Sequence, residues 1–461
     1  MAVASPAPRP PLSAGQRALA VGLVLSVTLV AFESTAVITA LPTITDELDG
    51  LSLYGTTIAA YMLADLIALV WSGETADRRG VRLPFLICIG FFISGLVVAA
   101  TAQSMIVVVI GRFLQGAGSG GFAPLSYICV RRAFPEARQG SMYASLSAGW
   151  VLPSLIAPAV AGIVTDTLGW RWVFIGIAPP AVAVALLTAR AMGSIAPPEP
   201  REERHPSRLP RAVQASAGVG CVAFGLQNQR LVLTIVLTFA GVVIAAPALR
   251  RLLPAGTFRA RPGLPAILAV RFLATATFLG VDSFVPLAAD RFHSARPIVQ
   301  GFVVAGSAVA WSAGQAYAAR RGTTLLPRTG ARTGFTLLLT GVALTAPVLW
   351  SSWPLAATFV SWCIGGLGIG ILFNPTTVAS MSYAVDGHEG TVSSQVHLAD
   401  SLGFGIMSVI GGATVAYADH SSLSLRSALG TNFALAAACA CVGLVVSSGV
   451  RSQARGEPST A

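Results

Sequence analysis

Apolar residues fill most of this chain in long runs, without the alternation of apolar and polar positions that marks a strand. Runs of about twenty residues with few or no charges recur along almost the whole length, and each is long enough to cross roughly 30 Å of hydrocarbon as an α-helix. A transmembrane barrel would show shorter, alternating segments. The pattern therefore predicts an all-α integral membrane protein.

Six such runs precede a polar stretch, and six follow it. The polar stretch, residues 193–212, is rich in Pro, Arg and Glu and has no apolar periodicity, as expected of a solvated linker. The first run is too long for the core of a signal peptide, so we expect it to be retained. We predict membrane helices at 17–41, 51–72, 83–102, 105–130, 141–166, 170–193, 264–287, 297–319, 332–350, 355–380, 391–417 and 427–449.

A further apolar stretch, 212–249, lies after the linker and is interrupted by the polar residues 227–230. Arginine bias decides how many times it crosses, because cytoplasmic loops collect Arg. If both termini are cytoplasmic and the stretch is a hairpin, 23 arginines fall inside, five outside and two within helices. A single crossing would place the arginines of 320–332 outside. We predict an even number of crossings, hence fourteen helices in total, or twelve if the stretch does not insert.

The expected organisation is therefore a pair of six-helix bundles joined through two extra helices. A short repeated motif, called the echo below, supports this internal repeat. ADRRG (76–80) and AARRG (318–322) each follow the second predicted helix of their half. Paired bundles are the architecture of transporters that hold their substrate between the halves, near the midplane. The predicted units are an N-terminal bundle (1–192), a cytoplasmic linker (193–211), an extra transmembrane hairpin (212–250) and a C-terminal bundle (251–461).

Composition agrees with a membrane protein and excludes several other classes. The chain is 54% hydrophobic and 11% charged, with a mean hydropathy of +0.72. Its net charge of +11 is scattered through short loops, which argues against nucleic acid as a partner. There is no Lys and no phosphate-binding loop, so an ATPase motor and an enzyme are not expected. The five His and six Cys lack metal-ligand spacing, so we expect no metal and no cofactor.

Short motifs carry a more specific signal. The first helix contains AFESTAVITALPTI, and the fourth contains GRFLQGAGSGG, with Arg112, Gln115, Gly116 and Gly118 in an Arg-x-x-Gln-Gly-x-Gly pattern. The loop after the second helix, SGETADRRGVR, matches Gly-x-x-x-Asp-Arg-x-Gly-x-Arg. Its matching residues are Gly73, Asp77, Arg78, Gly80 and Arg82. At these residues the chain resembles the major facilitator superfamily, and within it the fourteen-helix drug:proton antiporter branch.

The fifth helix departs from that resemblance. The antiporter pattern Gly-x-x-x-Gly-Pro-x-x-Gly-Gly appears here as PSLIAPAVAG, which keeps Pro158 and Gly162 but has Pro153, Ala157 and Ala161 where glycine is usual. In the family this segment accompanies antiport, so the departure leaves the direction of coupling open. The following GWRWVF (169–174) again resembles the antiporter branch.

The resemblance implies the major facilitator fold, a bacterial inner membrane location with both termini cytoplasmic, and a monomer. The use of Arg alone for basic residues also favours a GC-rich bacterial genome. Implied partners are a small-molecule substrate, protons and the lipid bilayer. In the family, Gly73 of the loop allows close packing against a helix of the other half, and Asp77 meets the positive N-terminal end of that helix, locking the inside shut.

Charged residues inside the predicted helices are the candidate functional residues, because a charge at the bilayer centre costs about 2.5–3.5 kcal/mol on insertion scales. Glu33 and Arg112 are expected to form a proton-coupling pair, with Asp65 as a further proton or substrate site. Structural ion pairing is the alternative for each. His397 and Asp400 are three residues apart and share a helical face. The candidates for the substrate cavity are Tyr61, Gln115, Arg271, Asp282, Asn374, His397 and Asp400.

These features predict a secondary active transporter that exports small amphipathic compounds by proton-coupled alternating access. Uptake or exchange of a specific metabolite or lipid by the same fold is the alternative, motivated by the missing glycines of the fifth helix. A membrane sensor that keeps the fold without transport is the third possibility, which the short loops and the absence of a soluble output domain disfavour.

Overall fold

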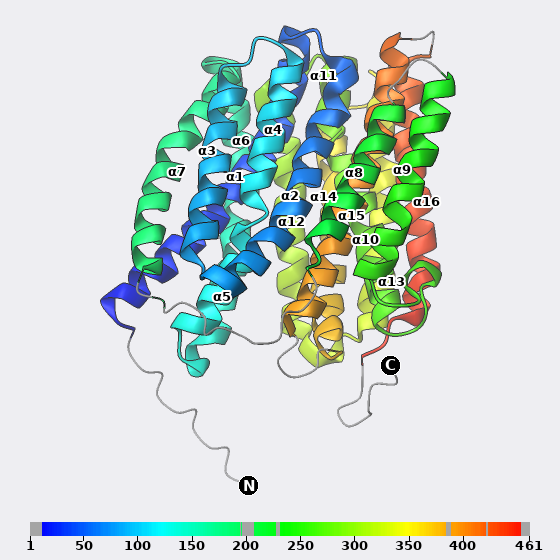
Figure 1. The fold of residues 1–461 in the computed structure, drawn as a ribbon. Coiled ribbons are helices and arrows are strands. Elements are labelled where there is room, and N and C mark those ends of the chain that lie inside the picture. Colours follow the sequence, from blue (N-terminus) through cyan, green and yellow to red (C-terminus); the bar gives the residue numbers. More distant parts are fainter. Residues whose placement is uncertain are drawn as a thin grey trace.

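The structure, a computed structural model, describes residues 12–193, 195, 207–226, 231–383, 389–420 and 423–452. Every regular element in these residues is helical (Figure 1). The α-helices are α1 (Ala14–Glu47), α2 (Tyr54–Arg79), α3 (Arg82–Ala100), α4 (Met105–Ser119), α5 (Phe122–Ala133), α6 (Glu136–Thr167), α7 (Arg171–Met192), α8 (Leu209–Leu226), α9 (Leu231–Leu252), α10 (Leu264–Asp282), α11 (Val285–His293), α12 (Pro297–Arg321), α13 (Pro327–Thr345), α14 (Leu355–Met381), α15 (Glu389–His420) and α16 (Leu425–Val446). Short 3₁₀ helices occur at Leu51–Leu53, Thr257–Arg259, Gly322–Thr324, Ala346–Leu349 and Ser447–Gly449.

The all-α membrane fold predicted from the sequence is confirmed. Twelve helices among the described residues are long and apolar enough to cross a membrane. Two predicted helices are each divided: 105–130 breaks at Gly120 and Gly121 into α4 and α5, and 264–287 breaks after Asp282 into α10 and α11. α1 begins and α16 ends at the same end of the bundle, the lower end in Figure 1.

Two groups of helices, α1–α7 and α10–α16, pack against each other along two seams. α6 packs on α12 at one seam, and α2 packs on α15 at the other. Gly80 and Gly322, the glycines of the ADRRG and AARRG echo, each follow a helix end, and their φ angles are +81° and +51°. Glycine adopts positive φ without steric cost. Both α2 and α12 therefore end at a glycine with positive φ, although α12 continues directly into a 3₁₀ helix and α2 does not.

The extra stretch forms a pair of packed helices, α8 and α9. α9 is one of the twelve candidate membrane helices, whereas α8 is not. α8 also lies against α2 and α15, so it covers the seam between the two groups on that side. At its start, the Ser207 hydroxyl and the Arg208 backbone N–H both donate to the Glu74 carboxylate at 2.5 Å. The predicted linker lies largely outside the described residues.

The two halves approach most closely at the end of the bundle opposite the start of α1. There the Tyr54 hydroxyl of α2 donates to the carbonyl of Ser283 at 2.7 Å. Gly55 of α2 faces Gly412 of α15 so closely that a Cβ on either would overlap backbone of the other. Small residues allow membrane helices to approach to this distance. The α2–α15 seam is therefore closed at this end.

The second seam is closed in the same way. A Cβ on Gly162 of α6 would lie 2.5 Å from the carbonyl oxygen of Pro297 in α12, and a Cβ on Gly301 would overlap the carbonyl of Pro158. Two ion pairs join the halves beside these contacts: Arg291 with Asp46, and Arg296 with Asp166. The residues of the fifth-helix motif that the sequence retains, Pro158 and Gly162, thus lie in direct contact with the other half.

Substituting Gly162 with leucine should prevent the two halves from meeting at this end, because the side chain would collide with the backbone of Pro297. A cysteine pair at Asp46 and Arg291, in a chain whose native cysteines are replaced, reports the contact as disulfide yield. We expect the yield to fall several-fold in Gly162→Leu. Gly176→Leu is the matched control, since no atom lies within 4 Å of its Cβ position. Equal yields in the two variants would contradict the assignment.

Candidate functional site

A buried ion pair between α1 and α4 lies at the centre of the N-terminal half. Arg112 donates through Nη1 to Glu33 and, at 2.8 Å, to the side-chain oxygen of Gln115. Glu33 is fully buried, and Arg112 is 4% exposed. The contact between Glu33 and Arg112 predicted from the sequence is present. Within the described structure, Glu33 Oε2 and Arg112 Nε have no hydrogen-bond partner, so each member of the pair keeps an unused polar atom.

Tyr61 and Asp65 of α2 lie close to α4 because one glycine within α4 and one directly after it let the two helices approach. A Cβ on Gly116 would overlap the carbonyl of Tyr61, and one on Gly120 would overlap the carbonyl of Asp65. The Arg112 guanidinium consequently lies over the Tyr61 ring at 4.2 Å from its centroid, a favourable cation–π geometry. The GRFLQGAGSGG motif is therefore a packing surface that places Tyr61 next to Arg112 and Asp65 next to Ser119.

Asp65 is bound by a hydroxyl. Ser119 donates to its Oδ1 at 3.1 Å, and the ion pairs that the described chain contains do not include Asp65. The alternative considered from the sequence, pairing with an arginine, does not occur in the described residues. Ser119 was not identified from the sequence, although its position four residues after Gln115 places both on one face of α4.

A central cavity adjoins the buried pair. Its volume is about 20 Å³, which is room for about one water molecule, and its lining includes Ser34, Val37, Thr57, Met62, Arg112 and Phe404. Phe404 belongs to α15, so both halves contribute to the lining. Arg112 thus contacts the cavity and the fully buried Glu33 at once.

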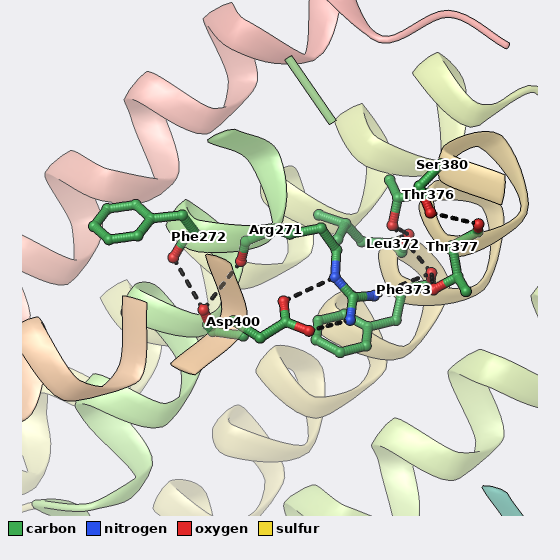
Figure 2. A network of polar contacts seen from close by, with 9 residues as sticks. Arg271, Phe272, Leu372, Phe373, Thr376, Thr377, Ser380 and Asp400 are labelled. Atoms are coloured by element: carbon green, nitrogen blue, oxygen red, sulfur yellow. Dashed lines mark hydrogen bonds and ion pairs between the residues drawn. The ribbon is translucent and has the colours of Figure 1, made fainter. Parts of the chain in front are cut away.

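The C-terminal half holds a second buried ion pair, between Arg271 of α10 and Asp400 of α15 (Figure 2). Arg271 donates through Nε to Asp400 Oδ1 at 2.8 Å and through Nη2 to Oδ2, a bidentate arrangement. Its Nη1 donates to the Thr377 hydroxyl at 3.1 Å, and its guanidinium lies 3.5 Å from the centroid of the Phe373 ring. Arg271 therefore joins three helices, α10, α14 and α15.

The remaining predicted cavity residues do not gather around one point. Asp282 is buried and accepts hydrogen bonds from Trp362 Nε1 at 2.6 Å and from the Ser307 hydroxyl at 3.1 Å. Asn374 is half-buried, and His397 is exposed. The side chain that pairs with Asp400 is Arg271, whereas the sequence suggested a pair of His397 with Asp400. Trp362, Thr377 and Phe373 were missed because no helical spacing links them to the acids and arginine that they contact.

The motif that the sequence analysis placed in a loop lies mainly in the last turns of α2, and only Gly80 and Val81 separate α2 from α3. This segment is at the opposite end from the closed contacts. Asp77 pairs with Arg132 of α5 at 3.2 Å, and its side chain is 64% exposed. No atom lies within 4 Å of the Cβ position of Gly73. Arg78 and Arg82 are exposed. In this conformation Asp77 therefore contacts its own half.

Apolar helices in two bundles, with buried charges beside a cavity between them, are the arrangement of a secondary transporter. The sequence profile of the Major Facilitator Superfamily matches residues 23–408, and the chain belongs to this family. This confirms the family identified from the motifs.

Relatives support the same assignment. The chain is 27% identical to an MFS-type transporter of Metarhizium majus, over 86% of this chain and 70% of that protein. It is 26% identical to a probable multidrug-efflux transporter of Mycobacterium tuberculosis, over 82% of this chain and 83% of that protein. Among solved structures, a bacterial homologue of the human lysosomal transporter Spinster, inward-facing and unoccupied, aligns with a TM-score of 0.63 at 16% identity, covering 95% of this chain and 96% of that chain.

Removing Arg112 alone should destabilise the protein by about 3–5 kcal/mol, because Glu33 would be left as an unpaired buried charge. Arg112→Met should therefore lower the thermal unfolding midpoint in detergent, and adding Glu33→Gln to the same chain should restore part of the loss. Arg132→Met with Asp77→Asn is the matched exposed pair and should change the midpoint little. If Arg112→Met and the double variant unfold at the same temperature, an unpaired charge on Glu33 is not the cause of the loss.

Proposed function

We propose that this protein is a proton-coupled exporter of small amphipathic compounds, working by alternating access in a bacterial inner membrane with both termini in the cytoplasm. The observation that carries the proposal is the buried pair of Glu33 and Arg112, of which Arg112 also lines the cavity between the halves. The resemblance of the chain to a probable multidrug-efflux transporter supports the substrate class.

The mechanism follows from the two charges. With Glu33 ionised, Arg112 is held against it. Protonation of Glu33 removes that attraction. The guanidinium, which already contacts Gln115 and Tyr61 and lines the cavity, is then free to turn toward a substrate. Asp65 is a second acid in the same half and carries no cation of its own among the described residues. A cationic or polar substrate group and a proton would then compete for the same carboxylates, which ties substrate release to proton entry.

The direction is part of the proposal. The described contacts between the halves gather at the end opposite the start of α1, which the arginine bias assigns to the outside. This conformation is thus closed outside, and Asp77 at the cytoplasmic end of α2 pairs with Arg132 of its own half. Uptake by the same fold is the competing function. Under an imposed proton gradient, an exporter moves its substrate out of the cytoplasm and an uptake protein moves it in.

Replacing Glu33 by glutamine should abolish proton-gradient-driven transport, because Gln cannot take up or release a proton, although its side-chain oxygen can still accept a hydrogen bond from Arg112. Because Arg112 loses its counter-charge, the unfolding midpoint of the variant is measured beside its transport rate. The measurement is dye flux in proteoliposomes under an imposed pH gradient, with and without a protonophore. Glu47→Gln, on the same helix but at its exposed end beside Arg171, is the control and should transport near the wild-type rate. Wild-type exchange in Glu33→Gln would refute the assignment of this acid, and gradient-driven accumulation in the opposite direction would favour uptake.

Asp77→Asn should slow transport, since an ionised side chain at this position is proposed to meet the other half when the cytoplasmic end closes. The equivalent position in the C-terminal echo, Ala319, is exposed and holds no acid, so Ala319→Asn should leave the rate unchanged. Both rates come from the same liposome assay. Equal losses of rate in the two variants would contradict a specific role of the Asp77 carboxylate.

A further inference from the structure

A groove on the outside of the helix bundle is separate from the central cavity. It lies where α8 packs beside α2 and α4, and its volume is about 320 Å³. Its floor consists of small residues, among them Ala60, Gly220 and Ala223. Phe113 and Phe224 form its sides and are 45% and 63% exposed. Phe113 belongs to α4, which with α2 is a candidate membrane helix, so its exposed ring is expected to face hydrocarbon. Phe224 belongs to α8, which packs beside α2.

The groove changes in polarity along its length. Ser52 and Thr56 line one end, where α2 begins, and Leu63 lines the other. At about 1.5 Å per residue in an α-helix and 2 Å in a 3₁₀ helix, Ser52 and Leu63 are roughly 17 Å apart along the axis. One leaflet contributes about half of the ~30 Å hydrocarbon core. The groove therefore spans one leaflet, with hydroxyls at the membrane surface and apolar groups toward the midplane.

We propose that this groove binds one acyl tail of a membrane phospholipid, in the leaflet opposite the start of α1. The glycerol ester region would lie at Ser52 and Thr56, and the tail would extend over Ala60 and Gly220 to Leu63. The groove and a phospholipid change polarity in the same direction. Each is polar at the membrane surface and apolar toward the bilayer midplane. A tail gains dispersion contacts with the small-residue floor and the two phenyl rings, and leaves no polar group unsatisfied.

The tail would lie one helix away from two functional surfaces. The opposite face of α2 carries Thr57 and Met62, which line the central cavity. Gly55 on the same helix forms the contact with Gly412 that closes the seam. A lipid that binds only when α2 has this position would stabilise the closed arrangement by mass action. Phospholipid is thus assigned as a ligand of the conformation in which the halves meet at this end.

Gly220→Leu tests the assignment with little strain. A Cβ on Gly220 would meet only Leu63 Cδ1, at 3.6 Å, which is ordinary contact, so the backbone fits and the side chain fills the groove. Ala217→Leu adds similar bulk on the same helix at an exposed position that does not line the groove. Phe224→Ala removes one side of the groove and serves as a second variant should Gly220→Leu fold poorly.

The full chain in nanodiscs is labelled with a phosphatidylglycerol whose acyl tail carries a photoreactive diazirine, and the adducts are mapped by mass spectrometry. We expect adducts concentrated in 59–63 and 220–224, reduced several-fold in Gly220→Leu and Phe224→Ala and unchanged in Ala217→Leu. Three results would overturn the proposal. Adducts spread evenly over the lipid-facing helices would show no preferred site. Loss of label on adding a transported dye, or on association with a second copy of the chain, would assign the groove to that occupant instead.

Discussion

A charged side chain inside the hydrocarbon core needs a partner, and this constraint organises both halves of the protein. Four helices carry the charges of the two pairs, and each pair joins helices far apart in the sequence: Glu33 with Arg112, and Arg271 with Asp400. The two pairs differ in their surroundings. Arg271 is held by a bidentate carboxylate, a hydroxyl and a ring, whereas Arg112 keeps an unpaired nitrogen beside the cavity. The N-terminal pair is the one with room to rearrange.

Glycine determines how closely the helices around these charges approach. Gly116 of α4 and Gly120 directly after it admit the backbone of α2, which brings Tyr61 to the buried arginine and Asp65 to Ser119. Between the halves, Gly55 and Gly162 admit the backbone of α15 and α12. The same physical device thus assembles the site within one half and closes the two halves against each other. A small residue at such a point is a geometric requirement, and a larger one would separate the helices.

The fold was accessible from the sequence because membrane crossing imposes a length and an apolarity that composition reveals directly. The contact of Glu33 with Arg112 was accessible through motif resemblance. The pairing of Arg271 with Asp400 was not, since α10 and α15 meet only through tertiary packing and nothing in the spacing of the two residues indicates it. The breaks that separate α4 from α5 and α10 from α11 were also missed, because apolarity continues across them. What periodicity cannot supply is which faces of different helices meet.

The two kinds of contact that close the bundle opposite the start of α1 respond differently to the medium. The glycine contacts are close van der Waals contacts between helix backbones and involve no charged groups. The pairs of Asp46 with Arg291 and Asp166 with Arg296 are partly exposed, and such surface pairs contribute about 0–1 kcal/mol each and weaken as the Debye length shortens. Raising the ionic strength on that side of the membrane would thus loosen the polar half of the closure and leave the apolar half intact. The occupancy of this conformation is in this way coupled to the salt concentration of the solution that bathes it.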